Sequence, residues 1–347
     1  MDNQDLTEVF GNLLSQNQAF VFYRLPRSNS VHCFFQDDST LNLTSDLKIY
    51  GFVMSRFYDS LPAPYISNKN RLEFKYNPSF LQSKVDHSGS LSEDKSTFID
   101  IVNKTKSAIS SGLLKKLVVA RDVRINEAVD HLKMFTNLLS LYTNAMVYYW
   151  RHPKAETWIG ATPEQLFSTQ SGRLTTMALA GTLPYNDEEK YHWSVKEKTE
   201  QGWVRDTLQK DLKNLFPRDV VKCSETFTQR AGNLVHLCNT LTVNSLSFNT
   251  LELIKTLHPT PAVGGIPVEE GTQFLIKNEK LDRAYYAGFL GPVCKETKID
   301  LFVNLRCAQI FKEAILLYVG AGITSDSDPE KEWEETQNKT KTLLAAL

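Results

Sequence analysis

Short apolar runs broken by polar turns, with amphipathic stretches between them, constrain the fold of this chain more than any other feature. Residues 20–23 and 31–35, and later KLVVARDV and MVYYWRH, have the β-branched and aromatic character of strands. DRAYYAGFLGP, LFVNLRCAQIF and AILLYVGAGI predict a meander of strands. Between the runs we expect helices, at 97–111, 132–141, 187–215, 247–257 and 328–346. These elements predict an α+β fold of large antiparallel sheets with helices packed outside.

The domain organisation follows from where the motifs lie. At 347 residues the chain exceeds a typical domain, yet mixed enzymes of this size often fold around one core, so length leaves the domain number open. Residues 1–95 are expected to be a strand-rich N-terminal part of the same fold. Within and just beyond them, the polar segment 67–96 predicts a linker. Residues 96–347 hold the motifs and are the expected catalytic core.

Composition excludes several classes of protein. The 39 basic and 40 acidic side chains nearly cancel, which argues against a nucleic-acid or membrane-surface partner. The five cysteines are scattered, odd in number and form no Cys-x-x-Cys pair, as in a reducing cytoplasm. The N-terminus carries acids where a signal peptide carries bases, and no apolar run approaches ~18 residues. We therefore expect a cytoplasmic protein.

Two Glu-x-x-Glu pairs are candidate metal ligands. Glu197 with Glu200, and Glu332 with Glu335, project from one face of a helix because positions three apart are neighbours there. Two such faces brought together would offer the hard oxygen ligands that Mg²⁺ prefers. A single pair is also typical of a solvated helix face. The second pair follows an Asp328 or Ser327 cap and Pro329, which mark the start of a helix.

Lys116 and Glu164 are candidate acid–base residues. Strand alternation puts Lys116 on the apolar face shared with Val118 and Ala120, where loss of hydration favours the neutral amine that a general base requires. The alternative is a lysine whose head group reaches water at a strand end. Glu164 follows Thr162 and Pro163, which predict a helix start, so the helix dipole would favour its charged form unless burial outweighs it.

Single polar residues and glycines in apolar runs are candidate substrate contacts. His236 is equally typical of a core histidine bonded to backbone, whereas Arg306, if buried, needs a carboxylate partner, which its planar fork can bind with two hydrogen bonds. Gly320 and Gly322 lack the third glycine of a dinucleotide motif and instead favour close approach of backbone N–H groups to a carboxylate.

Together, ten motifs resemble the chorismate-utilising enzymes, which include isochorismate, salicylate, anthranilate and aminodeoxychorismate synthases. In order they are KLVVAR, GATPEQLF, MALAGT, SVKEKTEQ, LVHL, LHPTPAVGGIP, YYAGFLGP, LFVNLR, YVGAGI and DPEKEWEETQNK, spanning about residues 96–345. The resemblance implies two large antiparallel sheets packed together with helices outside.

The resemblance also implies a role for each matching residue. Lys116 would be the base that activates water, and Glu164 the acid that protonates the departing hydroxyl. Glu200 and Glu335 would hold Mg²⁺, with Glu197 and Glu332 acting through water. The substrate chorismate would be bound by Gly181, Thr182, His236, Ala262, Tyr286, Arg306, Gly320, Gly322 and Lys339.

Two positions favour the isochorismate synthase branch. Amine-adding members resemble one another in a glutamine-type residue where Lys116 stands, and aminodeoxychorismate synthases carry a lysine where this chain has Ala180. The expected reaction is reversible addition of water at C2 of chorismate with loss of the C4 hydroxyl. The alternatives are a salicylate synthase, which goes on to eliminate pyruvate, and an anthranilate or aminodeoxychorismate synthase component.

The chain departs from the family pattern at a few positions. Gln201 stands where many members have histidine, Thr162 replaces a common serine, and the stretch after Thr182 lacks the usual Arg and Gly residues.

We expect a monomer without a glutaminase subunit. Menaquinone biosynthesis is favoured, with siderophore biosynthesis as the alternative.

Overall fold

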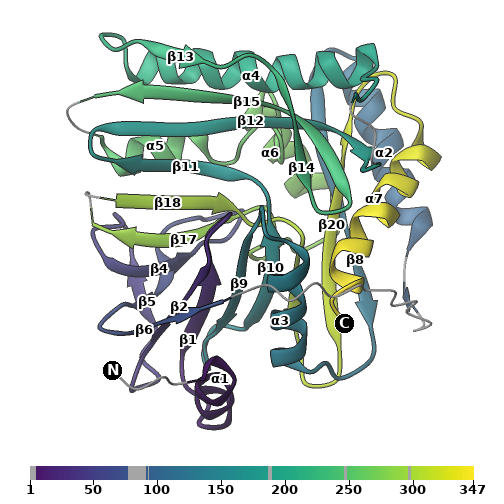
Figure 1. The fold of residues 1–347 in the computed structure, drawn as a ribbon. Coiled ribbons are helices and arrows are strands. Elements are labelled where there is room, and N and C mark those ends of the chain that lie inside the picture. The colour runs from purple at the N-terminus through teal and green to yellow at the C-terminus, as the bar shows by residue number, and fades with distance from the viewer. Residues whose placement is uncertain (1–4, 77–90, 93, 187–189, 246–247, 296–297) are drawn as a thin grey trace.

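The structure is a computed structural model that describes residues 5–76, 91–92, 94–186, 190–245, 248–295 and 298–347. Within these residues two ten-stranded antiparallel sheets combine with helices in an α+β fold, as predicted (Figure 1). The helices of this part of the chain are α1 (Leu6–Ser15), α2 (Lys95–Ser110), α3 (His131–Leu141), α4 (Val195–Leu215), α5 (Thr250–Leu257), α6 (Val268–Asn278) and α7 (Pro329–Leu344).

The first sheet, sheet A, joins N-terminal, central and C-terminal strands. They are β1 (Phe20–Arg24), β2 (Ser30–Phe35), β6 (Asn70–Lys75), β7 (Leu91–Ser92), β8 (Lys116–Ile125), β9 (Met146–Arg151), β10 (Thr157–Thr162), β16 (Gly265–Ile266), β19 (Cys307–Ile310) and β20 (Ile315–Ile323). Their order is β16-β8-β20-β19-β10-β9-β1-β2-β6, and β7 pairs with β8.

The second sheet, sheet B, is built in the same mixed way. Its strands are β3 (Asn42–Thr44), β4 (Tyr50–Met54), β5 (Ala63–Ser67), β11 (Gln165–Gln170), β12 (Arg173–Pro184), β13 (Val221–Cys223), β14 (Phe227–Ala231), β15 (Leu234–Asn244), β17 (Phe289–Cys294) and β18 (Lys298–Val303). The order is β13-β15-β12-β11-β18-β17-β4-β5-β3, and β14 pairs with β15. Residues before 96 therefore add strands to both sheets.

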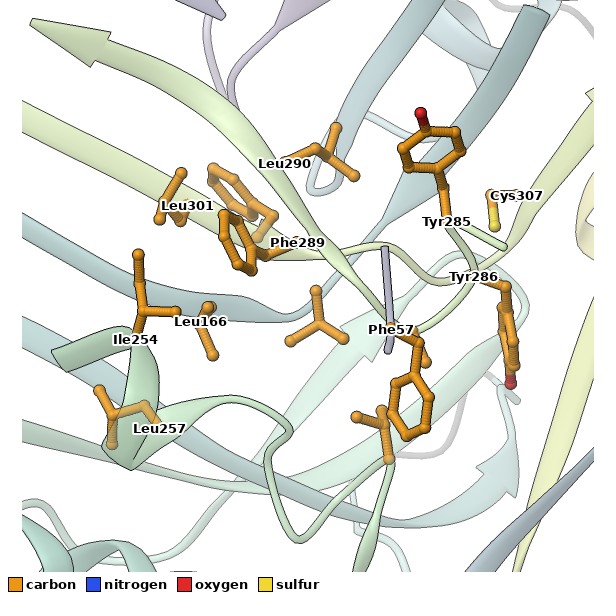
Figure 2. Close-up of a cluster of buried hydrophobic side chains, with 14 of the residues drawn as sticks. Phe57, Leu166, Ile254, Leu257, Tyr285, Tyr286, Phe289, Leu290, Leu301 and Cys307 are labelled. Carbon is orange, nitrogen blue, oxygen red and sulfur yellow. The ribbon is translucent and has the colours of Figure 1, made fainter. Parts of the chain in front are cut away.

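Central strands are apolar on both faces because both faces are covered. In β9, Val147 and Tyr149 pack in a cluster with α1 and α3, while Tyr148 and Trp150 pack in the larger core cluster, which draws on both sheets. Figure 2 shows part of that larger cluster, where Leu166 and Leu301 of sheet B lie with α5 side chains. This double burial explains why the runs MVYYWR and FVFYR do not alternate with polar residues.

Among the places where the chain passes from one sheet to the other, two short segments are important for the site described below. Residues 163–164 connect β10 of sheet A to β11 of sheet B, and residues 304–306 connect β18 of sheet B to β19 of sheet A. The predicted meander was therefore wrong in connectivity, because LFVNLRCAQIF supplies strands to different sheets. DRAYYAG, also placed in that meander, forms turns rather than a strand.

Two further predictions differ from the structure. The expected linker was wrong for residue 67, which ends β5, for residues 70–75, which form β6, for residues 91–92, which form β7, and for residues 95–96, which begin α2. Strand β6 pairs with β2 at the edge of sheet A, and Leu72 and Phe74 turn inward while alternate residues face solvent. Residues 77–90 and 93 of that linker lie outside the described residues. Helices α1 and α6 were not predicted, and α4 begins at Val195, whereas residues 187–189 of the expected helix lie outside the described part.

The remaining helix predictions are confirmed. Helices α2, α3, α5 and α7 lie within a few residues of their expected ranges. Asp328 caps α7 by accepting hydrogen bonds from the backbone N–H groups of Glu330 and Lys331, and Pro329 begins the helix. None of the helices in the described ranges combines the length and the apolar character that crossing a membrane requires.

Candidate active site

One cavity collects most of the predicted site residues. It is bordered by the two sheet-crossing segments and by strands of both sheets, with α4 and α7 supplying carboxylates. Its lining includes both predicted acid–base residues, every predicted substrate residue and three of the four predicted metal ligands, namely Lys116, Glu164, Gly181, Thr182, His236, Ala262, Tyr286, Arg306, Gly320, Gly322, Lys339, Glu197, Glu200 and Glu335. Glu332 does not line the cavity.

Lys116 begins β8, and its predicted burial on an apolar strand face is confirmed. Its side chain is 1% exposed, and its Nζ lies 2.8 Å from Oε1 of Glu200 on α4. Gly322 on the paired strand β20 makes room for this contact, because a Cβ there would lie 2.5 Å from the same carboxylate oxygen. The glycine thus serves the Lys116–Glu200 ion pair, whereas the sequence suggested only close approach of a backbone N–H group.

Glu164 is a buried carboxyl in the 163–164 crossing segment, so the predicted helix start there was wrong. Thr162 does not cap a helix; its hydroxyl donates to the carbonyl of Val303, and the residues from Gln165 onward pair with β18. The Glu164 carboxylate accepts a hydrogen bond from Thr260 at 3.1 Å. Burial raises the pKa of Glu164 from 4.5 to about 7, although the Thr260 hydrogen bond and the charge of Lys116 act the other way.

His236 and Arg306 form a buried pair at the cavity wall. His236 lies in β15, and its Nδ1 donates to the carbonyl of Gly181 at 2.9 Å, which leaves Nε2 to accept from the Arg306 guanidinium at 2.7 Å. Burial and the charge of Arg306 lower the pKa of His236 to about 3, so the ring is neutral. His236 therefore bonds to backbone, as a core histidine does, and it also lines the cavity.

Arg306 lies in the 304–306 crossing segment, so its predicted place inside a strand was wrong. Its backbone φ is 47°, and the guanidinium also donates to the carbonyl of Ala231 at 2.6 Å. Within the described residues it forms no ion pair with a carboxylate, and burial lowers its pKa to about 10. A desolvated guanidinium of this kind suits an anionic ligand.

Backbone geometry shapes the rest of the cavity. Gly181 has a φ of 71° at the register shift between β12 and β15, a conformation that favours glycine. Gly320 leaves space for the Tyr286 hydroxyl, which would lie 2.7 Å from a Cβ at that position. Lys339 of α7 donates to the Gly320 carbonyl at 2.7 Å and therefore ties α7 to β20 beside the cavity.

The four predicted metal ligands, here called the carboxylate cluster, each have a partner within the protein. Besides the Glu200–Lys116 pair, Glu335 lies 2.8 Å from Lys339 Nζ. Glu332 is 2% exposed and lies 2.7 Å from Lys196 Nζ. Glu197 accepts hydrogen bonds from Ser194 in a capping box at the start of α4. Glu332 therefore does not line the cavity. Glu197 stabilises the start of α4 in addition to any role at a metal.

The chemistry of this donor set fits Mg²⁺. Glu200 and Glu335 are 12% and 30% exposed and line the cavity, so their oxygens can meet an entering cation. Mg²⁺ commonly takes one or two protein carboxylates and completes its shell with water and substrate oxygens. Within the described residues, no three acidic, histidine or cysteine side chains come together as a group that could hold a metal ion.

Among the residues of the site that sequence reasoning missed, two contact its charged groups directly. Thr260 lies in LHPTPAVGG and bonds Glu164 across 96 residues of sequence, a contact that no local pattern indicates. Lys196 lines the cavity and stands four residues before Glu200 on α4, so the helical spacing did carry a signal. Gln201, the departure noted beside Glu200, is buried and hydrogen-bonds Asn239 instead of entering the cavity.

The fold of two large antiparallel sheets and the sequence of this chain both match one class of enzymes, the chorismate-binding enzymes. The family model described as "Chorismate binding enzyme" covers residues 58–347. The chain belongs to this family.

The relatives of this chain include isochorismate synthases and anthranilate synthase components, so they leave open which product it makes. Isochorismate synthase MenF of Haemophilus influenzae is 30% identical over 272 residues, which cover 74% of this chain but only 61% of that enzyme. Anthranilate synthase component 1 of Saccharolobus solfataricus is 26% identical over 286 residues, or 76% of this chain and 68% of that protein. The structure of MenF, the menaquinone-specific isochorismate synthase of Escherichia coli, superposes with a TM-score of 0.81 at 21% identity, covering 100% of this chain and 92% of that one.

Proposed function

We propose that this chain is an isochorismate synthase, an isomerase that uses Mg²⁺ to convert chorismate reversibly to isochorismate. The observation that carries the proposal is that a buried amine, Lys116, and a buried carboxyl, Glu164, line the same cavity. Lysine at 116 together with Ala180 resembles the water-adding members. The similarity to an isochorismate synthase supports the same choice, and the similarity to an anthranilate synthase component makes the product the point to test.

In the proposed reaction Lys116 and Glu164 move the protons. Lys116 takes a proton from the water that attacks C2 of chorismate, the double bonds shift, and Glu164 gives its proton to the hydroxide that leaves C4. A carboxyl whose pKa is about 7 still holds that proton near neutral pH. The Glu200 carboxylate holds the Lys116 side chain in place. If Glu200 bound Mg²⁺ instead, Lys116 would lose this partner and would be free to act as a base.

Other residues bind and orient the substrate. Arg306, held by the neutral His236, offers its guanidinium to one of the two carboxylates of chorismate. Glu200 and Glu335 would hold Mg²⁺, which when bound supplies positive charge for the ring carboxylate. Because these groups are positioned before the reaction, they can stabilise developing charge without reorganisation.

The test is product analysis with purified protein. Incubation with chorismate and Mg²⁺ should give isochorismate as the main product, and isochorismate should return chorismate. Addition of ammonium should leave the products unchanged. Salicylate as the main product would instead identify a salicylate synthase, and an ammonium-dependent aromatic amine would identify an anthranilate-type component.

We also propose a biological setting for this activity. We expect a cytoplasmic monomer that works without a glutaminase subunit and supplies menaquinone biosynthesis, with siderophore biosynthesis as the alternative. Deletion of the gene followed by quinone and siderophore assays separates the two pathways. Sedimentation of the purified protein tests the monomer.

A further inference from the structure

Lys196 is a charged residue of the cavity that has no part in the proposed proton transfers. It is the second residue of α4, and its Nζ lies 2.7 Å from Oε1 of Glu332 on α7. The lysine side chain is 33% exposed and lines the cavity, whereas its carboxylate partner is 2% exposed and does not. One ammonium therefore joins the two helices that carry the carboxylate cluster.

Lys196 lines the cavity together with both proposed metal ligands, Glu200 and Glu335. Its ion pair with Glu332 holds the ammonium between α4 and α7, the two helices that carry these ligands. In this respect it differs from Lys339, which forms its ion pair with Glu335 within α7.

We propose that Lys196 is a built-in counter-cation of the carboxylate cluster and sets the affinity of the site for a divalent cation. A fixed positive charge beside the ligands opposes entry of a second cation. The dianionic substrate adds negative charge to the same cavity, so the lysine favours binding of the metal together with substrate over binding before it. This inference rests on the metal site of the proposed function.

The experiment is calorimetric titration of Mg²⁺ into the full chain without substrate. K196Q should bind Mg²⁺ tighter than wild type by on the order of tenfold, because it removes one positive charge close to the site. K196R retains the charge and should match wild type. K198Q removes an equal charge from the exposed side of the same helix and is the matched control, expected to stay within about twofold of wild type.

A second variant keeps the test valid if K196Q folds poorly. E332Q retains an oxygen that can accept from Lys196 but leaves the ammonium uncompensated, so Mg²⁺ should bind more weakly than in wild type. K196Q combined with E332Q should return close to wild-type affinity. The gain in K196Q should shrink between 0.1 M and 1 M salt, where the Debye length falls from about 10 Å to about 3 Å.

The outcomes separate this inference from the proposed function. If wild type binds Mg²⁺ but K196Q binds it no tighter than K198Q does, or E332Q is unchanged, the role of Lys196 is wrong and the metal site stands. If no form of the protein binds Mg²⁺ with or without chorismate, the metal part of the proposed function fails and this inference fails with it.

Discussion

Two buried arginines, Arg283 and Arg306, differ in how completely other groups of the protein bond their guanidinium groups. Arg283 is 0% exposed and donates to both oxygens of the buried Glu279, at 2.6 and 2.9 Å. Its remaining donors reach the carbonyls of Val118 and Val263, while Glu279 also accepts from the backbone N–H of Ala120. Arg306 bonds only a carbonyl and a neutral histidine, with no ion pair in the described residues.

We interpret this difference as that between a structural charge and a charge that is available to a ligand. The Arg283–Glu279 pair is neutral as a unit and ties β8 to the segment that carries Ala262, next to the cavity but outside it. Arg306 keeps a desolvated positive charge facing the cavity, and Glu164 keeps a carboxyl with one hydroxyl partner. Between these two arginines, incomplete pairing of the buried charge, rather than burial alone, marks the one that lines the candidate active site.

The largest effect is expected on turnover, from the amine of the cavity. Lys116→Ala should lower kcat by about 10²- to 10⁴-fold, because the proposed general base is lost, while the fold and chorismate binding remain. Single-turnover kinetics measure the loss in the chemical step, and equilibrium binding measures the affinity for chorismate. Lys115→Ala removes the exposed neighbouring lysine and should act like wild type. Unchanged turnover in Lys116→Ala would remove this residue as the base.

The next largest effect is expected on stability, from the saturated pair. Arg283→Met should reduce the free energy of unfolding by about 3–5 kcal/mol, because Glu279 would remain buried without its counter-charge. Urea unfolding measures the loss. Arg283→Met combined with Glu279→Met should recover much of it, since both charges are then absent. A loss below 1 kcal/mol in the single variant would contradict a structural role for the pair.

Glu164→Gln should separate activity from stability. The folded pKa of about 7 lies above the ordinary 4.5, so the wild-type fold loses stability as pH rises between these values, and the glutamine variant does not. At pH 8 the variant should be more stable by about 3 kcal/mol and at pH 4 nearly equal. Turnover should be largely lost in the variant, and in wild type it should decline above pH 7 as Glu164 loses its proton. If the difference in stability between the two proteins were the same at pH 4 and at pH 8, the raised pKa of Glu164 would be contradicted.

The smallest of these effects is expected from the unpaired arginine. Arg306→Met should raise KM for chorismate by about 10- to 100-fold, the value of one charge-assisted interaction, and should cost far less stability than Arg283→Met. Steady-state kinetics and urea unfolding of the two variants side by side give the comparison directly. Equal stability losses with an unchanged KM would show that Arg306 is as structural as Arg283.

Several features could be predicted because their causes are local. The start of α7 follows from Asp328 and Pro329, whose capping contacts lie within three residues. The burial of Lys116 follows from strand alternation, and the pairing of glutamates on α4 and α7 follows from helical spacing. The ten ordered motifs predicted the family, and with it the packing of two large sheets.

The tertiary structure alone decided what the local signals contradicted or omitted. Thr162, Pro163 and Glu164 carry the pattern of a helix start, yet the pairing of β11 with β18, more than a hundred residues away, makes them a passage between sheets. The same passage buries Glu164 and raises its pKa, reversing the effect expected of a helix dipole. Arg306 and Lys196 likewise take their roles from partners distant in sequence, His236 and Glu332. The sequence by itself thus determined most of the helices, the family and the residues available for chemistry, because their signals are local. The charges and pairings of those residues depended on burial that only the packed sheets create.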